Sequence, residues 1–342
     1  MAQILIVSPG VLSTVQDLGR VGYQKMGMPV AGVMDNYAAR MANILVGNDD
    51  NSAVIEAALL GPEIKFLSPS AVAVTGADMG AELNGVKIKN WKSYIASEGD
   101  ILKLKGAVAG LRSYIAFDGG ISVPPVMGSS STYIKGGIGG VDGRALKAGD
   151  VINIANTAPR PAIRELGPDH IPTYGGDITL RAVPGPFSEY FTKEGEALFF
   201  AQPYTIGGRS DRMGIFLEGE PLGFSNSTAD ILSSAILMGS VQITNDATPV
   251  ILMADRQTTG GYAQIATVIS PDLPKAAQAG PGAKITFQKV TVAEAQVIYK
   301  NYEANIEDIR AKLGAGIYVK SNSVSRLTLN GVSYGAIIEE VD

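Results

Sequence analysis

Residues 250–262 read Val-Ile-Leu-Met-Ala-Asp-Arg-Gln-Thr-Thr-Gly-Gly-Tyr. The run opens with apolar, β-prone residues, which predict a buried strand over Val250–Ala254. An acid, a guanidinium, an amide and two hydroxyls follow at once, and then a Gly-Gly pair. Short strands that end in turns, repeated along a glycine-rich chain, are typical of β-sandwiches and barrels.

The rest of the chain repeats this pattern. It has 41 glycines and 18 prolines in 342 residues, so turns are frequent. The other β-prone runs are Ile4–Val7, Ala71–Thr75, Ile101–Leu104, Leu111–Phe117, Val151–Ile154, Ile178–Val183, Gln264–Val268 and Lys284–Gln288. Asn84-Gly85 and Asn330-Gly331 are predicted hairpin turns, because both central positions need positive φ. We therefore expect a mainly β protein with a few helices, of the α+β class.

Helices are the minority. The pattern predicts one from Asp35 to Leu45, closed by Gly47, and a short one from Ser270-Pro271 to Gly280. The capping box Thr291-Val-Ala-Glu294 predicts a longer helix that ends at Gly314. A terminal hairpin, Ser325 to Val341, should follow it.

The Pro- and Gly-rich stretch Thr157–Gly176 is the expected domain boundary. We predict an N-terminal β-barrel subdomain with an early helix over 1–160, a second β-barrel subdomain over 177–290, and a helix plus hairpin over 291–342. Weak echoes between the halves, such as Gly149-Asp150 before one strand and Gly282-Ala283 before another, fit two related barrels. Chance similarity between turn-rich β sequences explains those echoes about as well.

Composition excludes several kinds of chemistry. The chain has no cysteine, so it has no disulfide, no thiolate nucleophile and no Cys-ligated zinc or iron–sulfur site. Its single histidine, His170, excludes any mechanism that needs two imidazoles from this chain. Paired aspartates or glutamates at metal-ligand spacing are not evident, so we expect no metal.

Charge and hydropathy bear on partners and location. With 28 basic and 33 acidic residues the net charge is −5, a poor match to nucleic acid or to anionic membrane surfaces. The first residues lack the basic and apolar regions of a signal peptide, and no run approaches the ~18–20 apolar residues of a membrane span. We expect a cytoplasmic protein with a small-molecule substrate.

Two polar clusters lie beside glycines and are candidate sites. Thr14-Val-Gln-Asp-Leu-Gly-Arg20 places Gln16, Asp17 and Arg20 around one turn, where they either pin the turn through an Asp17–Arg20 pair or contact a ligand. Ser210-Asp-Arg-Met-Gly214 again joins an acid and Arg212 to glycine. It suits a carboxylate or phosphoryl oxygen, or an inter-strand salt bridge.

The polar turn after Val250–Ala254 is the densest of these clusters, and polar groups at the mouth of a barrel strand are typical of sites. Asp255 can act there as a base or an orienting group, and Arg256 as an oxyanion clamp. Gln257 and Thr259 can supply hydrogen bonds. A purely structural turn is the competing interpretation.

Nucleotide fingerprints are absent. Gly136-Gly-Ile-Gly-Gly-Val-Asp-Gly143 fails the Gly-x-Gly-x-x-Gly spacing, and no Gly-x-x-x-x-Gly-Lys-Ser/Thr occurs. The cluster is either an anion-binding nest of backbone N–H groups or a flexible loop.

Taken together, these motifs resemble the carboxyltransferase A/B family, which includes allophanate hydrolase subunit 2, the KipA proteins and the C subunit of bacterial 5-oxoprolinase. The similar segments are residues 14–20, Gly32-Val-Met-Asp35, Ala42–Asn48, Asp211–Gly214 and Ala254–Tyr262, within about residues 10–290. The resemblance implies cyclophilin-like β-barrel subdomains and a site shared with a KipI-like partner chain (an allophanate hydrolase subunit 1 homologue), with a possible LamB/YcsF-like subunit. It adds Asp35, Gly261 and Tyr262 to the candidate substrate contacts.

The family implies three functions. In its 5-oxoprolinase members the implied reaction is hydrolysis of a cyclic amide to glutamate, coupled to hydrolysis of ATP, with magnesium, by the whole complex. Arg20, Arg212 and Arg256 would stabilise the charge that develops. Urea-carboxylating relatives imply CO₂ transfer from carboxybiotin, with Asp255 managing protons. A third possibility is a regulatory protein that binds a KipI-like kinase inhibitor.

The chain departs from the family pattern at three places. The family's Gly-Ser-Arg-Ser-Thr reads Gly128-Ser-Ser-Ser-Thr132, so Ser130 replaces an arginine. A Ser-Glu-Gly reads Ser233-Ser234-Ala235, and a Gly-Gln-Pro reads Ala247-Thr248-Pro249. Residues 325–334 faintly resemble the first strands of a biotinyl domain, but no Met-Lys-Met follows, and we expect no biotin attached to this chain. Because the implied site is shared between chains, we also expect an exposed apolar face.

Overall fold

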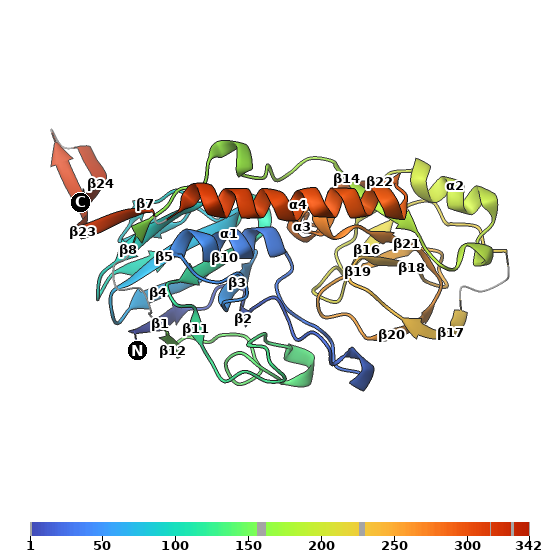
Figure 1. Ribbon diagram of the computed structural model, residues 1–342, viewed down its shortest axis with the longest axis horizontal. Helices are drawn as coiled ribbons and strands as arrows, with labels where there is room; N and C mark the ends of the chain where they lie inside the picture. The colour runs from blue at the N-terminus through green and yellow to red at the C-terminus, as the bar shows by residue number, and fades with distance from the viewer. Residues whose placement is uncertain (1, 156–161, 226–229, 315, 330–331, 342) are drawn as a thin grey trace. The chain divides into compact units, whose positions relative to one another are not determined.

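The computed structural model describes residues 2–155, 162–225, 230–314, 316–329 and 332–341 (Figure 1). They form two compact units. Unit 1 comprises Met1–Gly19, Asn36–Thr173 and Asp308–Asp342, and unit 2 comprises Arg20–Asp35 and Tyr174–Glu307. This division does not run linearly along the chain, because Arg20–Asp35 belongs to the same unit as the C-terminal half of the sequence.

Unit 1 is built on two large sheets. The seven-stranded sheet has the order β11-β12-β1-β4-β9-β6-β7, and the five-stranded sheet has the order β2-β3-β10-β5-β8. The strands of the first are β1 (Ala2–Ser8), β4 (Glu63–Phe66), β6 (Glu82–Leu83), β7 (Val86–Lys87), β9 (Ile101–Lys103), β11 (Ile121–Ser122) and β12 (Val151–Ile154). Those of the second are β2 (Leu12–Gln16), β3 (Val54–Ala58), β5 (Ser70–Asp78), β8 (Lys92–Ala96) and β10 (Ala109–Phe117).

One hydrophobic core joins these sheets. Strand β1 alternates, with Ala2, Ile4 and Ile6 buried and Val7 exposed, as expected for a strand with one face on the core. Helix α1 (Asn36–Val46) packs on β5 and β10, where the Thr75 hydroxyl donates to the Ala38 carbonyl at 2.6 Å. A third sheet pairs β13 (Ala162–Ile163) with the hairpin of β23 (Ile317–Leu329) and β24 (Val332–Val341).

Unit 2 contains a closed barrel of seven strands in the order β14-β21-β18-β19-β16-β15-β22. Its strands are β14 (Ile178–Pro184), β15 (Tyr204–Ile206), β16 (Gly214–Glu218), β18 (Ser240–Ile243), β19 (Pro249–Leu252), β21 (Gln264–Val268) and β22 (Lys284–Lys289). A two-stranded ribbon of β17 (Asp230–Ala235) and β20 (Thr259–Tyr262) accompanies it. The hydrophobic core of unit 2 consists mainly of aliphatic side chains and includes the stacked rings of Phe199 and Phe287.

The remaining α-helices are α2 (Lys193–Ala201), which the sequence analysis did not predict, and α3 (Leu273–Gln278) and α4 (Val292–Leu313), which it did. The described residues also include the short 3₁₀ turns Gln24–Met26, Ile134–Gly136, Pro168–His170, Ser188–Tyr190 and Ser270–Asp272. The capping box before α4 is formed: Thr291 N donates to Glu294 at 2.7 Å, and Glu294 N donates to the Thr291 hydroxyl at 3.2 Å. Within the described residues, no helix is long and apolar enough to cross a membrane.

The predicted class, mainly β with a few helices, is confirmed. All nine predicted strands and the three predicted helices are present, and Asn84 and Gly85 both have positive φ (51° and 76°). Of the two predicted barrels, the closed one is in unit 2, and the likeness to cyclophilin stays a prediction. The terminal hairpin is longer than predicted, and its expected turn at 330–331 lies outside the described residues.

The turn before β19 carries backbone strain. Ala247 adopts φ 58°, in the left-handed region that a Cβ disfavours. It closes the turn before β19, with its N–H donating to the Thr244 carbonyl at 2.9 Å.

Replacing Ala247 by glycine should therefore stabilise the protein. We expect Ala247→Gly to raise the free energy of unfolding by about 0.5–1 kcal/mol, because relief of the left-handed strain exceeds the added entropy of the unfolded chain. Urea unfolding measures this change. Ala304→Gly, at an exposed position within α4, is the matched control and should lose about 1 kcal/mol. A loss of stability in both variants would contradict the strain at Ala247.

Candidate functional site

The buried strand β19 leads directly into the polar turn that the sequence singles out. Met253 N donates to the Met213 carbonyl at 2.9 Å, and Asp255 N donates to the Arg212 carbonyl at 2.9 Å. These bonds continue the β16–β19 ladder past its last paired residues, Gly214 and Leu252. Two motifs that lie some forty residues apart in the sequence are thus brought side by side in unit 2.

Arg212 and Asp255 form a buried, bidentate ion pair. Nε and Nη2 of Arg212 donate to the two carboxylate oxygens of Asp255, each at 3.0 Å. Nη2 also donates to the Gly32 carbonyl at 2.6 Å, which ties the segment Arg20–Asp35 to the barrel within unit 2. Because both oxygens of Asp255 are engaged, this geometry favours an orienting role for Asp255 over that of a free base.

Arg256 is buried as deeply as Arg212 but is bonded differently. Its side chain is only 6% exposed, its Nη1 donates to the Met253 carbonyl at 3.2 Å, and its Nε makes no hydrogen bond to any described residue. Within the described part of the chain no carboxylate pairs with it. Burial lowers the pKa of the Arg256 guanidinium to about 10, so it remains protonated at neutral pH. A buried cation without a counter-ion is a candidate contact for an anionic group of a ligand.

Gln257 and Thr258 lead from Arg256 into the ribbon strand β20, which begins at Thr259. Gln257 and Thr259 are exposed, and Gly261 and Tyr262 are half-buried. Strand β20 pairs with β17 in the register Ser234↔Gly260 and Ala235↔Thr259. The second departure from the family pattern, Ser233-Ser234-Ala235, therefore lies directly opposite the candidate Thr-Thr-Gly-Gly-Tyr segment.

In unit 1, Asp17 holds a loop of three serines. Its carboxylate accepts from the Ser129 hydroxyl at 2.7 Å, from Ser130 N at 2.6 Å and from the Ser131 hydroxyl at 2.5 Å, and also from Gly19 N at 2.8 Å. Asp17 is thus the anchor of the segment Gly128–Thr132. We call these contacts the Asp17 clamp.

Gln16 extends the clamp. Its Nε2 donates to the Thr14 hydroxyl at 3.0 Å and to the Thr132 carbonyl at 3.1 Å. Its side chain is fully buried, and its Oε1 accepts no hydrogen bond from the residues that the structure describes. Gln16 and Asp17 therefore act together on the loop Ser129–Thr132.

Arg20 and Asp35 belong to unit 2, apart from the unit that contains Gln16 and Asp17. The Arg20 side chain is almost completely buried, and its backbone N–H donates to the Val30 carbonyl at 2.8 Å. Asp35 is also buried, and one of its oxygens accepts from Gln278 Nε2 at 2.8 Å and lies 3.5 Å from the Tyr174 hydroxyl. The contact with Gln278 fastens the end of α3.

The structure thus gathers the predicted residues into two sets. Unit 2 brings Arg212, Asp255 and Arg256 together, and unit 1 brings Gln16 and Asp17 together. Sequence reasoning did not include Ser129 and Ser131 among the candidates. The signal was available, because three consecutive serines after a glycine are natural donors for a buried carboxylate.

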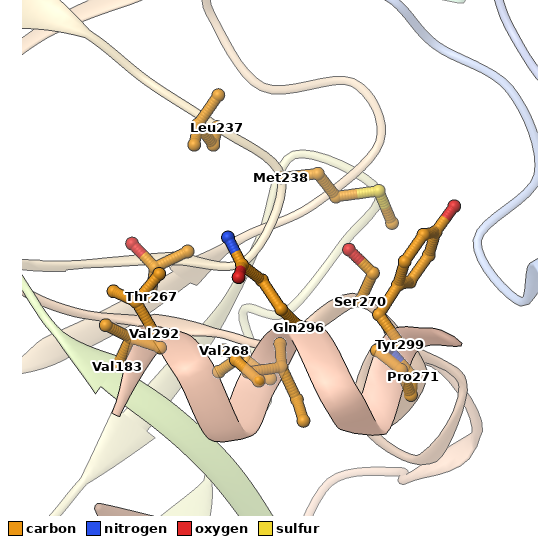
Figure 2. Close-up of a pocket in the computed structure, with 12 residues that line it drawn as sticks. Val183, Leu237, Met238, Thr267, Val268, Ser270, Pro271, Val292, Gln296 and Tyr299 are labelled. Atoms are coloured by element: carbon orange, nitrogen blue, oxygen red, sulfur yellow. The ribbon is translucent and has the colours of Figure 1, made fainter. Parts of the chain in front are cut away.

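An apolar groove in unit 2 contains none of these residues. It has a volume of about 450 Å³ and is lined by Val183, Leu237, Met238, Thr267, Val268, Ile269, Ser270, Pro271, Val292, Ala295, Gln296 and Tyr299 (Figure 2). Leu237, Val292 and Tyr299 are exposed around it, and Leu232 on the ribbon is 94% exposed. These side chains provide exposed apolar surface on unit 2, and the partner-facing surface expected from the sequence stays a prediction.

Replacing Arg256 and Arg212 by methionine should change stability in opposite directions. Arg256→Met removes a buried charge that has no counter-ion among the described residues, so we expect the free energy of unfolding to rise by about 1 kcal/mol. Arg212→Met leaves the Asp255 carboxylate buried and unpaired, so we expect a loss of about 3–5 kcal/mol. Urea unfolding of the two variants measures both changes. A similar loss of unfolding free energy in both variants would contradict the conclusion that Arg212 is paired with a carboxylate and Arg256 is not.

Comparison with known proteins identifies the family of the chain. The model of the family described as "Carboxyltransferase domain, subdomain A and B" matches residues 26–289. The C subunit of the 5-oxoprolinase of Escherichia coli (strain K12) is 36% identical over 308 residues, which cover 90% of this chain and 98% of that protein.

Larger proteins share the same region. The urea amidolyase of Lachancea kluyveri is 33% identical over 328 residues, 89% of this chain but only 18% of that protein. The crystal structure of the K. lactis urea amidolyase superposes with a TM-score of 0.85 at 29% identity, covering 90% of this chain and 20% of that one. The chain therefore belongs to the carboxyltransferase subdomain A and B family and is homologous to the C subunit of 5-oxoprolinase and to urea amidolyase.

Proposed function

We propose that this chain is the component equivalent to the C subunit in an ATP-dependent amidohydrolase of the 5-oxoprolinase type. The proposed reaction converts 5-oxoproline, ATP and water to glutamate, ADP and phosphate. The observation that carries the proposal is the match to the C subunit of the Escherichia coli 5-oxoprolinase, which this chain covers over 98% of its length. The similar part of a urea amidolyase is only 18% of that protein.

The chemistry of such a reaction needs stabilisation of negative charge. A lactam carbonyl is a poor electrophile, and transfer of the γ-phosphoryl group of ATP to its oxygen makes the carbon open to attack by water. Attack and ring opening then break the C–N bond and release phosphate. Negative charge develops on phosphoryl and carbonyl oxygens during these steps, and a preorganised cation stabilises it.

Arg256 is the residue of this chain that best fits that task. It is buried, it is charged at neutral pH, and no carboxylate in the described residues neutralises it. We assign it the contact with an anionic oxygen of the substrate. Arg212 and Asp255 neutralise one another, so we assign them the positioning of the turn that carries Arg256.

Other subunits complete the proposed enzyme. We propose that the chain acts with a KipI-like partner and with a LamB/YcsF-like subunit. We also propose that the complex is cytoplasmic, since its co-substrate ATP is available there. The Escherichia coli relative is one lettered subunit of a 5-oxoprolinase, which supports a complex of several chains. ATP and magnesium enter at the level of that complex.

The test is release of ADP by the reconstituted complex with and without 5-oxoproline. We expect ADP release that depends on 5-oxoproline and is accompanied by glutamate. Arg256→Gln should lower kcat/KM by about 100-fold or more, as expected for loss of a buried charge contact. Lys289→Gln, a surface change in the same unit, should have little effect. A well-formed complex that releases no ADP on adding 5-oxoproline would refute the proposal.

A second candidate is a biotin-dependent carboxyltransferase component. The family description and the superposition on a urea amidolyase support it. In that case Arg256 would hold a carboxylate in place of a phosphoryl oxygen. Transfer of labelled CO₂ from carboxybiotin to a urea-like acceptor, by a complex that is inactive toward 5-oxoproline, would favour this function.

A further inference from the structure

Arg212 and Arg256 differ in how they use the same edge of the guanidinium group. Arg212 donates from Nε and Nη2 to the two carboxylate oxygens of Asp255, each at 3.0 Å. The only hydrogen bond from the Arg256 side chain to a described residue leaves from Nη1, which donates to the Met253 carbonyl at 3.2 Å. The Nε–Nη2 edge of Arg256 therefore donates to no group in the described part of the chain.

This unused edge has a defined complement. The N–H groups of Nε and Nη2 point the same way in one plane, so together they match two oxygens of one planar group. The pair of Arg212 and Asp255 shows, within the same unit, that a carboxylate fits this edge with two equal distances. Nε of Arg256 is closed to solvent, and a buried donor without an acceptor is costly. A carboxylate placed on the edge would satisfy both donors.

Charge narrows the choice of ligand. Arg212 and Asp255 neutralise one another, and Arg256 stays protonated at neutral pH because burial lowers its pKa only to about 10. These three buried groups therefore carry one net positive charge. A carboxylate balances that charge, whereas a phosphoryl group carries about −1.5 to −2 and would leave excess negative charge beside Asp255.

We infer that Nε and Nη2 of Arg256 bind the carboxylate of the lactam substrate as a bidentate pair. The inference rests on the proposed function, in which the substrate 5-oxoproline carries a carboxylate on its ring. It names which anionic oxygens Arg256 contacts: those that the substrate carries before the reaction, and not the phosphoryl oxygens that form during it. Because Arg256 is only 6% exposed, the carboxylate meets it in a poorly hydrated environment, which strengthens a charge-assisted pair.

Two lactams that differ in charge provide the test. Isothermal titration of the reconstituted complex, without ATP, gives the dissociation constants of 5-oxoproline and of its neutral carboxamide. For the natural chain we expect 5-oxoproline to bind at least about tenfold more tightly, because only the carboxylate forms the charge-assisted pair. In Arg256→Gln the two lactams should bind within about twofold of one another, because 5-oxoproline loses that pair.

Two further variants separate the fork of donors from charge alone. Arg256→Lys keeps a positive charge but loses the planar fork, so the preference for 5-oxoproline should fall to about threefold. Arg209→Gln is the matched control, because it removes an exposed arginine of the same unit, which lies over the Phe216 ring. It should leave the preference unchanged. The melting temperature of each variant reports whether it is folded.

The outcomes separate this inference from the proposed function. A preference that persists in folded Arg256→Gln, or a natural chain that does not distinguish the two lactams, overturns the carboxylate contact. Loss of the preference in Arg256→Gln, in a complex whose natural form releases no ADP, supports the contact and contradicts the proposed reaction. ADP release that depends on 5-oxoproline, with a preference that ignores residue 256, does the reverse.

Discussion

The buried pair of Arg212 and Asp255 is the contact on which unit 2 depends. It joins the residues that flank β16 and β19, and through the Gly32 carbonyl it fastens a segment from the N-terminal part of the chain. A pair of this kind adds little net stability over an apolar contact, but it is costly to break. Its effect is to fix one geometry for the turn that follows β19, and every candidate group in that turn inherits its position from it.

The ion pair of Arg212 and Asp255 positions the turn that carries Arg256, but the Arg256 side chain is not part of that pair. Asp255 neutralises Arg212, whereas no carboxylate among the described residues neutralises Arg256, the next residue along the chain. Leaving a buried cation without a counter-ion costs folding free energy, and such costs are typically concentrated at functional positions. The contrast between the two arginines is therefore a stronger argument for a site than the density of polar residues in the motif.

Local patterns in the sequence predict the elements of this fold well. The capping box at Thr291, the Asn84-Gly85 turn and the apolar run before Ala254 each act through neighbours in the chain, and the structure confirms all three. Contacts between residues far apart in the sequence could not be predicted from such patterns. The residues around Asp17 give no sign that its carboxylate accepts hydrogen bonds from serines more than a hundred residues later. Likewise, the residues around Asp255 give no sign that its carboxylate pairs with Arg212.

The same limit explains why the departures from the family pattern gain meaning only in three dimensions. In the sequence, Ser130, Ser234 and Ala247 are three unrelated changes. In the structure, Ala247 is a matter of backbone strain, Ser234 faces Gly260 across the ribbon, and Ser130 stands on the Asp17 clamp. Strain at Ala247 acts on the stability of its turn, whereas the contacts of Ser234 and Ser130 act on the geometry of the ribbon and of the Ser129–Thr132 loop. What each of the three positions does is therefore decided by the contacts that the fold gives it, because its neighbours in the sequence do not include the groups that it meets.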